Sequence, residues 1–226
     1  MRVLAIDTAL EACSAAVLDT ETGVLASEMR PMVRGHAEAL IPLLSKVMAE
    51  AHTAFDGLDR IAVTTGPGSF TGLRVGIAAA RGIALSAEKS AVGLTTLAAF
   101  AAPHIAGDDS IGVAVAIDAR HGHVYLQVFG PGGRTLVAPR IAAIRDAARI
   151  AATGRTRIAG NAAEALAAAW PANEVPPVQV DQQKVPDIAC VARLGAVANG
   201  GPATLKPVYL RAPDAQPQAA ARLPRR

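Results

Sequence analysis

Two similar stretches decide the fold of this chain: LAIDTALEACSAAVLDTETGVLAS (residues 4–27) and VAIDARHGHVYLQVFGPGGRTLVA (residues 115–138). In each, an apolar strand ends in Ile-Asp and is followed by a tight turn, a second strand, a turn that contains glycine, and a third strand. Self-similarity of this kind indicates an internal repeat. We therefore expect two halves, each of which begins with a meander of three strands.

Further strands and helices follow each meander, and Pro103 with the next few residues marks a break between the halves. Apolar periodicity predicts helices at 36–52, 72–87, 97–102, 141–152, 161–170 and 185–200, with short strands at 60–65 and 91–93. This layout is typical of the α/β folds of the actin, Hsp70 and sugar-kinase class (ASKHA). We expect two actin-like lobes, each with a ribonuclease-H-like mixed sheet and flanking helices, and a flexible tail, over residues 1–104, 105–210 and 211–226.

The composition of the chain argues against direct binding of nucleic acid. The sequence has 226 residues, 51% of them hydrophobic, so a sizeable core can form. Its 22 Lys and Arg against 19 Asp and Glu leave a net charge of only +3, and 3% aromatic residues offer few surfaces on which bases could stack. If RNA matters to this chain, another protein must hold it.

The cysteines and the apolar segments both indicate a cytoplasmic protein. Cys13 and Cys190 lie in apolar segments far from any Cys/His cluster, so we expect two reduced, buried thiols. Asp7 interrupts the amino terminus before the apolar core of a signal peptide can form. The longest apolar stretch, residues 94–106, is too short to cross a bilayer.

A glycine-rich loop, GPGSFTGLRVGIAAARG (residues 66–82), joins a strand to a helix, as phosphate-binding loops do. A Walker loop needs Lys and Ser or Thr after its last glycine, whereas here Leu73 and Arg74 follow. A dinucleotide-binding loop has the spacing G-x-G-x-x-G, and this loop has one residue more. The simpler interpretation is a tight turn with Ser69 or Thr71 as the helix cap.

Small residues recur every fourth position along the helix after this loop, at Gly72, Gly76, Ala80 and Ala84. Glycine inside a helix costs about 1 kcal/mol relative to alanine, so the ridge predicts the close approach of another backbone. The preceding helix carries an apolar stripe roughly 160° wide, formed by Ala37, Leu40, Ile41, Leu43, Leu44, Val47, Met48 and Ala51. Two interpretations stay open: these helices pack partly against another protein, or both faces are internal.

Asp7 and Asp118 each end an apolar strand, where ATP-binding members of this fold class place the aspartates that hold a metal-nucleotide. The turn after Asp7 lacks glycine, and the first glycine after Asp118 is Gly122, four residues later. Asp7 and Asp118 are therefore only weak candidates for cofactor binding. His121 and His123 alternate along a strand, but no third ligand is near in sequence, which favours an exposed polar pair over a metal site. The chain contains neither H-E-x-x-H nor G-x-S-x-G.

Several of these segments together resemble the TsaB family, also called YeaZ. The resemblance runs from residue 2 to about residue 214 and rests on LAIDTALEACSAAV, GPGSFTGLRVGIAAARGIAL, GLTTLAAFA, the segment from Asp118 to Tyr125, and PVYLR. Members of this family are bacterial subunits of the machinery that places a threonylcarbamoyl group on the adenosine beside the anticodon of tRNAs that read codons beginning with A. The resemblance implies an actin-like fold with no activity of its own.

The resemblance also implies which ligands and partners to expect. The paralogous subunit TsaD carries His-x-x-x-His for its metal where this chain has Thr96 and Phe100, so no metal and no cofactor is expected on this chain alone. ATP or ADP and a metal are expected in the partner subunits, TsaD and the ATPase TsaE. The chain is expected to form a homodimer in isolation and to meet tRNA only through the complex, with no membrane contact. The family usually has an acidic residue where this chain has His123.

The family uses two helices of its first lobe both for the homodimer and for TsaD, and the ridge and the stripe match that use. Arg74 and Arg81 lie on one face of their helix and are candidates for charged contacts, including contacts with a nucleotide at the subunit junction. The residues expected at this interface are His36, Leu40, Leu44, Val47, Gly72, Arg74, Gly76, Ala80 and Arg81. Two other functions stay open: a stand-alone ATPase or glycopeptidase (M22 type) of the actin-like fold, and an RNA-binding module.

Overall fold

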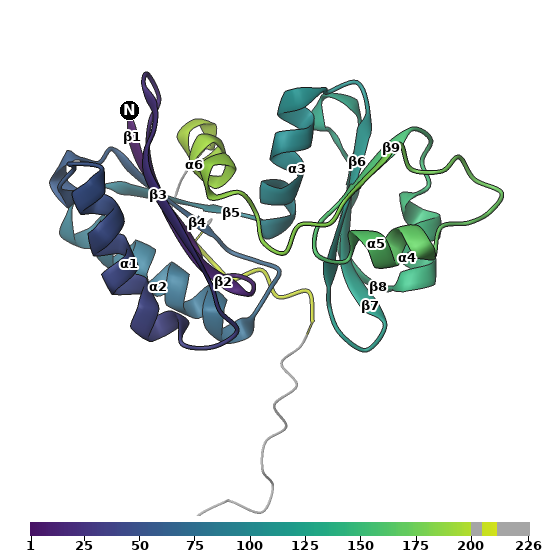
Figure 1. The fold of residues 1–226 in the computed structure, drawn as a ribbon, viewed down its shortest axis with the longest axis horizontal. Helices are drawn as coiled ribbons and strands as arrows, with labels where there is room; N and C mark the ends of the chain where they lie inside the picture. The colour runs from purple at the N-terminus through teal and green to yellow at the C-terminus, as the bar shows by residue number, and fades with distance from the viewer. Residues whose placement is uncertain (200–204, 212–226) are drawn as a thin grey trace, which may run out of the picture.

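The computed structural model describes residues 1–199 and 205–211 and contains two five-stranded mixed sheets (Figure 1). The strand orders are β3-β2-β1-β4-β5 and β10-β9-β6-β7-β8. In both sheets the central strand pairs antiparallel with the next strand along the chain and parallel with a later one. The expected repeat of two meanders is thus confirmed: β1 (Arg2–Asp7), β2 (Ala12–Asp19) and β3 (Gly23–Pro31) in the first half, and β6 (Gly112–Asp118), β7 (His123–Phe129) and β8 (Thr135–Ala143) in the second.

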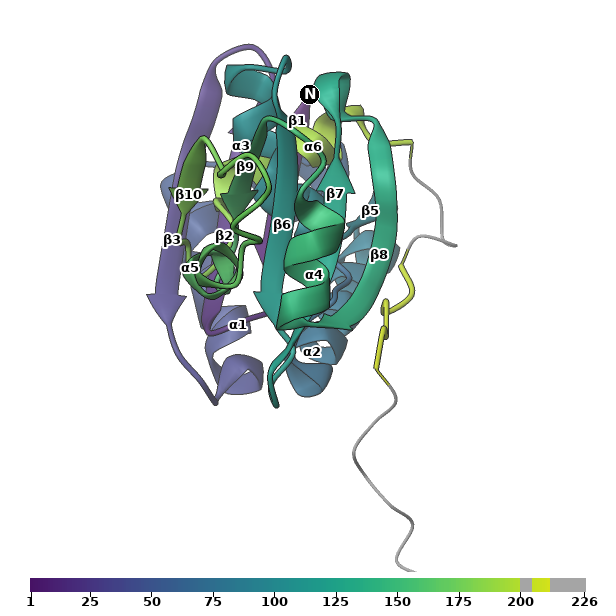
Figure 2. The same ribbon diagram turned by 90° about the vertical axis from the view of Figure 1, so that its right-hand side faces the viewer.

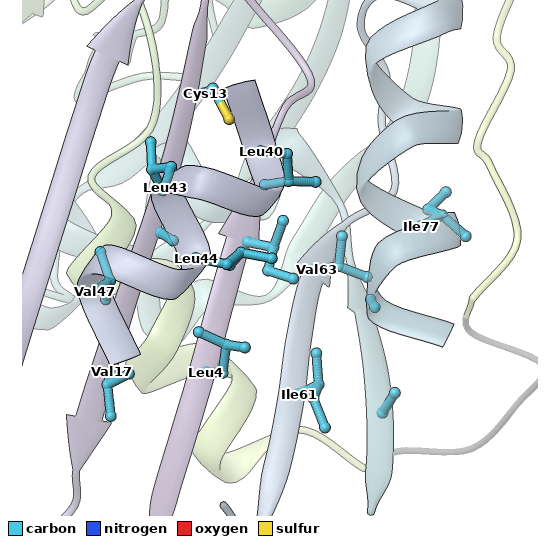
Figure 3. Packing of buried hydrophobic residues seen from close by; sticks show 14 of the residues in the cluster. Leu4, Cys13, Val17, Leu40, Leu43, Leu44, Val47, Ile61, Val63 and Ile77 are labelled. Atoms are coloured by element: carbon cyan, nitrogen blue, oxygen red, sulfur yellow. The ribbon is translucent and has the colours of Figure 1, made fainter. Parts of the chain in front are cut away.

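The first lobe adds two parallel strands and two helices: β4 (Arg60–Thr64), β5 (Ser90–Leu94), α1 (His36–Glu50) and α2 (Phe70–Ser86). Both helices cover one face of the sheet, and the core between them is aliphatic (Figure 3). Leu40, Leu43, Leu44 and Val47 have helical spacing, and each is almost fully buried against strand residues such as Leu4. Most of the apolar stripe is therefore packed inside the chain.

The second lobe has the same plan with shorter elements: β9 (Thr156–Ala159), β10 (Gln179–Asp181), α4 (Ile144–Ala151) and α5 (Ala163–Ala168). Helices α4 and α5 cover the outer face of this sheet (Figure 2). The helix expected over 141–152 is shorter than predicted, because residues 141–143 extend β8 and pair with β7. Strands β9 and β10 had no counterpart in the prediction.

The last helix of each half packs against the sheet of the other half. Helix α3 (Thr96–Gly107) follows β5, yet Leu97 and Phe100 pack on the second sheet. Helix α6 (Ile188–Val197) follows β10, yet Ile188 and Val191 pack on the first sheet. Figure 1 shows the two helices between the sheets. The predicted lobe boundary at residue 104 lies inside α3.

Of the expected break at Pro103 and AGDD (residues 106–109), only the second part is confirmed, since α3 continues through Pro103 and ends at Gly107. Contacts at the end of this helix account for its continuation. The guanidinium of Arg157 donates to the carbonyl oxygens of His104 (3.4 Å) and Asp108 (2.8 Å), and pairs with the Asp108 carboxylate at 2.7 Å. A cation at a helix C-terminus satisfies carbonyls that have no partner within the helix. Within the described residues, none of the helices combines the length and apolarity that crossing a bilayer requires.

Two glycines test this packing, and they give opposite predictions. A Cβ on Gly195 of α6 would lie 2.3 Å from the Cβ of Ala62 in β4, so Gly195→Ala must push the helix off the sheet. We expect it to lower the free energy of unfolding by about 1–3 kcal/mol. Gly82 of α2 has open space around it, so Gly82→Ala should raise that free energy by about 0.5–1 kcal/mol. Urea unfolding of both variants measures the difference, and equal effects would contradict the packing of α6.

Candidate functional site

A cleft of about 420 Å³ lies between the lobes, where the first strand of each half ends. The glycine-rich loop and the turn after Asp7 line it from the first lobe. The turn after Asp118 and the side chains of Tyr125 and Asn161 line it from the second. Residues 208–211 form a further wall. The structure thus brings together the chain segments that the sequence singled out, and the side chains within them differ sharply in exposure.

Asp7 is fully buried and does not line the cleft. One carboxylate oxygen, Oδ1, accepts hydrogen bonds from the Ala9 amide (3.1 Å) and from the Thr64 hydroxyl. The other oxygen, Oδ2, has no hydrogen-bond partner among the described residues. Burial raises the pKa of Asp7, and the bond from Thr64 opposes that shift only in part. The carboxylate is held by the chain itself, and its use by a nucleotide stays a prediction.

Asp118, at the equivalent position, is exposed and lines the cleft. Its Oδ1 accepts from the Arg120 amide at 2.8 Å, and its own amide donates to Oδ1 of Asn161 at 2.8 Å. His121 and His123 are both exposed, and Nδ1 of His123 lies 2.9 Å from the backbone oxygen of His121. In the part of the chain that the structure describes, no three His, Cys, Asp or Glu side chains are grouped as metal ligands.

The glycines of the loop allow the turn after Asp7 to pack directly on α2. A Cβ on Gly68 would lie 2.3 Å from the Ala9 oxygen, and one on Gly72 would lie 2.0 Å from the Thr8 oxygen. The amide of Ser69 donates to the Ala9 oxygen at 2.7 Å, so it is used within the chain. The Ser69 hydroxyl caps α2 by accepting from the Gly72 amide at 3.3 Å, which confirms the expected cap. The predicted close backbone approach is confirmed, and it comes from this turn.

Most residues expected at a protein interface are buried within the chain. His36 places Nε2 at 3.0 Å from the Leu10 oxygen, and Gly76 faces the Thr8 hydroxyl. Arg74 and Arg81 are the exposed members of the set. The interface role of all nine residues stays a prediction, and the buried members already pack against their own fold: His36, Leu40, Leu44, Val47, Gly72, Gly76 and Ala80.

Thr96 and Phe100 offer few donor atoms to a metal ion. Both are fully buried, and Phe100 has no donor atom while Thr96 offers a single hydroxyl. That hydroxyl has no partner among the described residues. The prediction of two buried thiols is confirmed for Cys13 and Cys190, which are free. Burial raises the pKa of Cys13 to about 11, so it is a poor nucleophile at neutral pH.

Residues 23–198 match the protein family described as TsaD, tRNA N6-adenosine threonylcarbamoyltransferase. The chain belongs to this family. Within the family it lies on the TsaB/YeaZ branch, since it is 40% identical to the Escherichia coli "tRNA threonylcarbamoyladenosine biosynthesis protein TsaB" over 125 residues. That alignment covers 55% of this chain and 53% of the relative, so the chain spans about half the length of that protein. An uncharacterised Mycobacterium tuberculosis protein is 34% identical over 96% of this chain and 95% of its own length.

Solved structures confirm the actin-like fold that the sequence predicts. YeaZ from Pseudomonas aeruginosa matches with a TM-score of 0.77 and 29% identity over 92% of this chain and 99% of that chain. A ROK hexokinase from Thermus thermophilus matches with a TM-score of 0.51 and 14% identity over 87% of this chain and 99% of its own. The hexokinase shows the fold alone. The TsaD-family chain described here therefore has the duplicated architecture of the sugar-kinase class.

Sequence reasoning missed the part that residues 208–211 play in the cleft. The PVYLR motif contributed to the family resemblance, but Arg211 was predicted to begin the tail. In the structure its guanidinium donates to the Ala119 oxygen at 2.9 Å, beside the turn after Asp118. The rest of the predicted tail, residues 212–226, lies outside the described residues. The aromatic and arginine residues of the motif were the available signal.

The burial of Asp7 gives a prediction for stability against pH. Folding favours the protonated form when burial raises the pKa of a carboxyl group above its ordinary value of 3.8. Stability contributed by that proton is therefore lost as the pH rises from about 4 through the raised pKa. Asp7→Asn removes this dependence, so the variant should gain stability relative to wild type between about pH 4 and pH 7.

Urea unfolding at several pH values measures this difference. Asp118→Asn is the matched control, because it removes an exposed carboxylate at the equivalent position of the second half. A constant difference between Asp7→Asn and wild type over this range would show that burial does not govern the protonation of Asp7.

Proposed function

We propose that this chain takes part in the biosynthesis of tRNA threonylcarbamoyladenosine as a non-catalytic partner subunit of a TsaD transferase. The observation that carries the proposal is that, in this chain of the TsaB/YeaZ branch, the groups that could bind a nucleotide or a metal are buried or already bonded within the chain. The Asp7 carboxylate is enclosed, and the glycine loop is packed against its own chain. The positions that hold metal-binding histidines in TsaD are Thr96 and Phe100, both buried. These features favour a role in organising a catalytic partner.

The partners follow from the same role. The chain binds TsaD, and TsaE joins the assembly, while tRNA is reached only through the complex in the cytoplasm. ATP or ADP and the metal belong to the partner subunits. In isolation the chain forms a homodimer through the surface that TsaD uses. The small net charge of +3 is in keeping with a chain that does not hold tRNA by itself.

The outward side of α1 and α2 is the surface we propose for these contacts. Ile41 of α1 is 58% exposed and Leu85 of α2 is 82% exposed, both large apolar side chains. Arg74 and Arg81 add two cations on α2, and Ala78 between them is also exposed. Apolar side chains that are flanked by arginines are typical of the centre of protein interfaces.

The alternative is a stand-alone ATPase or glycopeptidase. The fold shared with a hexokinase favours the first of these, because sugar kinases of this class use ATP. An ATPase requires that Mg-ATP bind the isolated chain and raise its unfolding temperature. Our proposal expects no such shift, so this measurement separates the two functions.

The proposal predicts the effect of a charge at the centre of the surface. Ile41→Glu should weaken both the homodimer and the complex with TsaD at least about tenfold, because an unpaired carboxylate is buried at the contact. Light scattering after size exclusion of the chain, of TsaD and of their mixture measures assembly. Threonylcarbamoyl transfer to tRNA, with TsaE and ATP present, is assayed on the same fractions.

Val175→Glu is the matched control, since Val175 is 54% exposed on the second lobe, away from α1 and α2. It should leave assembly and transfer unchanged. If Ile41→Glu assembles and supports transfer like wild type, the proposed surface is wrong. If wild type itself neither joins TsaD nor supports transfer, the proposed function is wrong.

A further inference from the structure

Residues 205–211, LKPVYLR, run without regular secondary structure from the first lobe to the second. In Figure 1 this segment is yellow and extends from the side of α2 toward the second lobe. Its two ends are anchored on different lobes. The lobes are otherwise joined through α3 and α6, the two helices that are exchanged between the sheets.

Three contacts fix the segment to the first lobe. Leu205 is buried in the core of that lobe, and its carbonyl oxygen accepts from Arg81 of α2 at 2.6 Å. The amide of Val208 donates to the Thr65 oxygen at 2.7 Å, which continues the line of β4. Both hydrogen bonds involve backbone groups of the segment, so they fix the course of its main chain.

An aromatic contact follows at the entrance of the cleft. The ring of Tyr209 packs on Phe70 with centroids 5.0 Å apart, and the guanidinium carbon of Arg74 lies 3.7 Å from the Phe70 centroid. The Tyr209 hydroxyl also accepts from Nε of Arg74 at 3.2 Å. Stacking, a cation–π contact and a hydrogen bond thus converge on the first turn of α2.

The far end reaches the second lobe through Arg211. Its guanidinium donates to the Ala119 oxygen at 2.9 Å, next to the exposed Asp118. Val208, Tyr209, Leu210 and Arg211 all line the cleft between the lobes. The segment therefore crosses the space between the glycine-rich loop and the turn after Asp118.

We propose that residues 205–211 act as a clasp that holds the two lobes together across the cleft and closes part of its entrance. If either end is detached, the residues that line the cleft then become more mobile on both lobes. This inference concerns the isolated chain and does not depend on the proposed function.

Amide hydrogen exchange of the full chain tests the clasp. Arg211→Ala removes the anchor on the second lobe, and we expect exchange to become about 3- to 10-fold faster, the range that the loss of one hydrogen bond gives. The effect should appear in the turn at 118–123 and also at the Val208 amide on the first lobe. Tyr209→Ala removes the aromatic contact with the first turn of α2, leaves the Leu205 and Val208 contacts in place, and should speed exchange in the same turn at 118–123.

Lys206→Ala is the matched control, because Lys206 lies on the same segment, its side chain is exposed, and it takes part in none of the contacts described above. It should leave exchange in both regions unchanged. The clasp is wrong if each anchor variant changes exchange only on its own lobe, since the ends are then independent. It is also wrong if Lys206→Ala has the same effect as Arg211→Ala.

Discussion

Two arginines on corresponding strands, β4 and β9, hold the exchanged helices, and the rest of the architecture depends on them. Arg60 of β4 pairs with Val3 in the first sheet, as Arg157 of β9 pairs with Val113 in the second. Arg60 donates to three carbonyl oxygens at the end of α6, at 2.9 to 3.2 Å. Arg157 donates to two carbonyl oxygens at the end of α3, those of His104 and Asp108. The carbonyl groups at a helix C-terminus lack partners within the helix and carry negative partial charge. Arg60 therefore holds α6, a helix of the second half, on the first sheet, and Arg157 holds α3, a helix of the first half, on the second sheet.

The repeat preserves the backbone and changes the chemistry of the cleft. Asp7 and Asp118 end equivalent strands, but the first is enclosed by Thr64 and the second faces the cleft. A phosphate needs backbone amides that point at it, and the Ser69 amide already donates to Ala9. The glycines that make the loop resemble a phosphate site are required for this internal packing. The Asp7 carboxylate and the Ser69 amide are therefore both engaged within the first lobe.

The sequence predicted the elements whose signals are local. The meanders, the cap at Ser69 and the buried cysteines depend on neighbouring residues, and all are confirmed. Strands β9 and β10 were missed because four and three residues are too few to show alternation. The exchange of α3 and α6 was missed for another reason. Periodicity shows that a helix has an apolar face, but it does not say which sheet covers that face.

The same limit applies to the stripe on α1, where the sequence left two interpretations open. Burial of Leu40, Leu44 and Val47 leaves the outward side to Ile41. On α2 the outward arginines are already engaged by the C-terminal segment. A partner that binds there meets guanidinium groups whose positions are fixed before it arrives, so less side-chain entropy is lost on binding. On the surface that we propose for partner contacts, residues 205–211 therefore already hold both arginines of α2 in place.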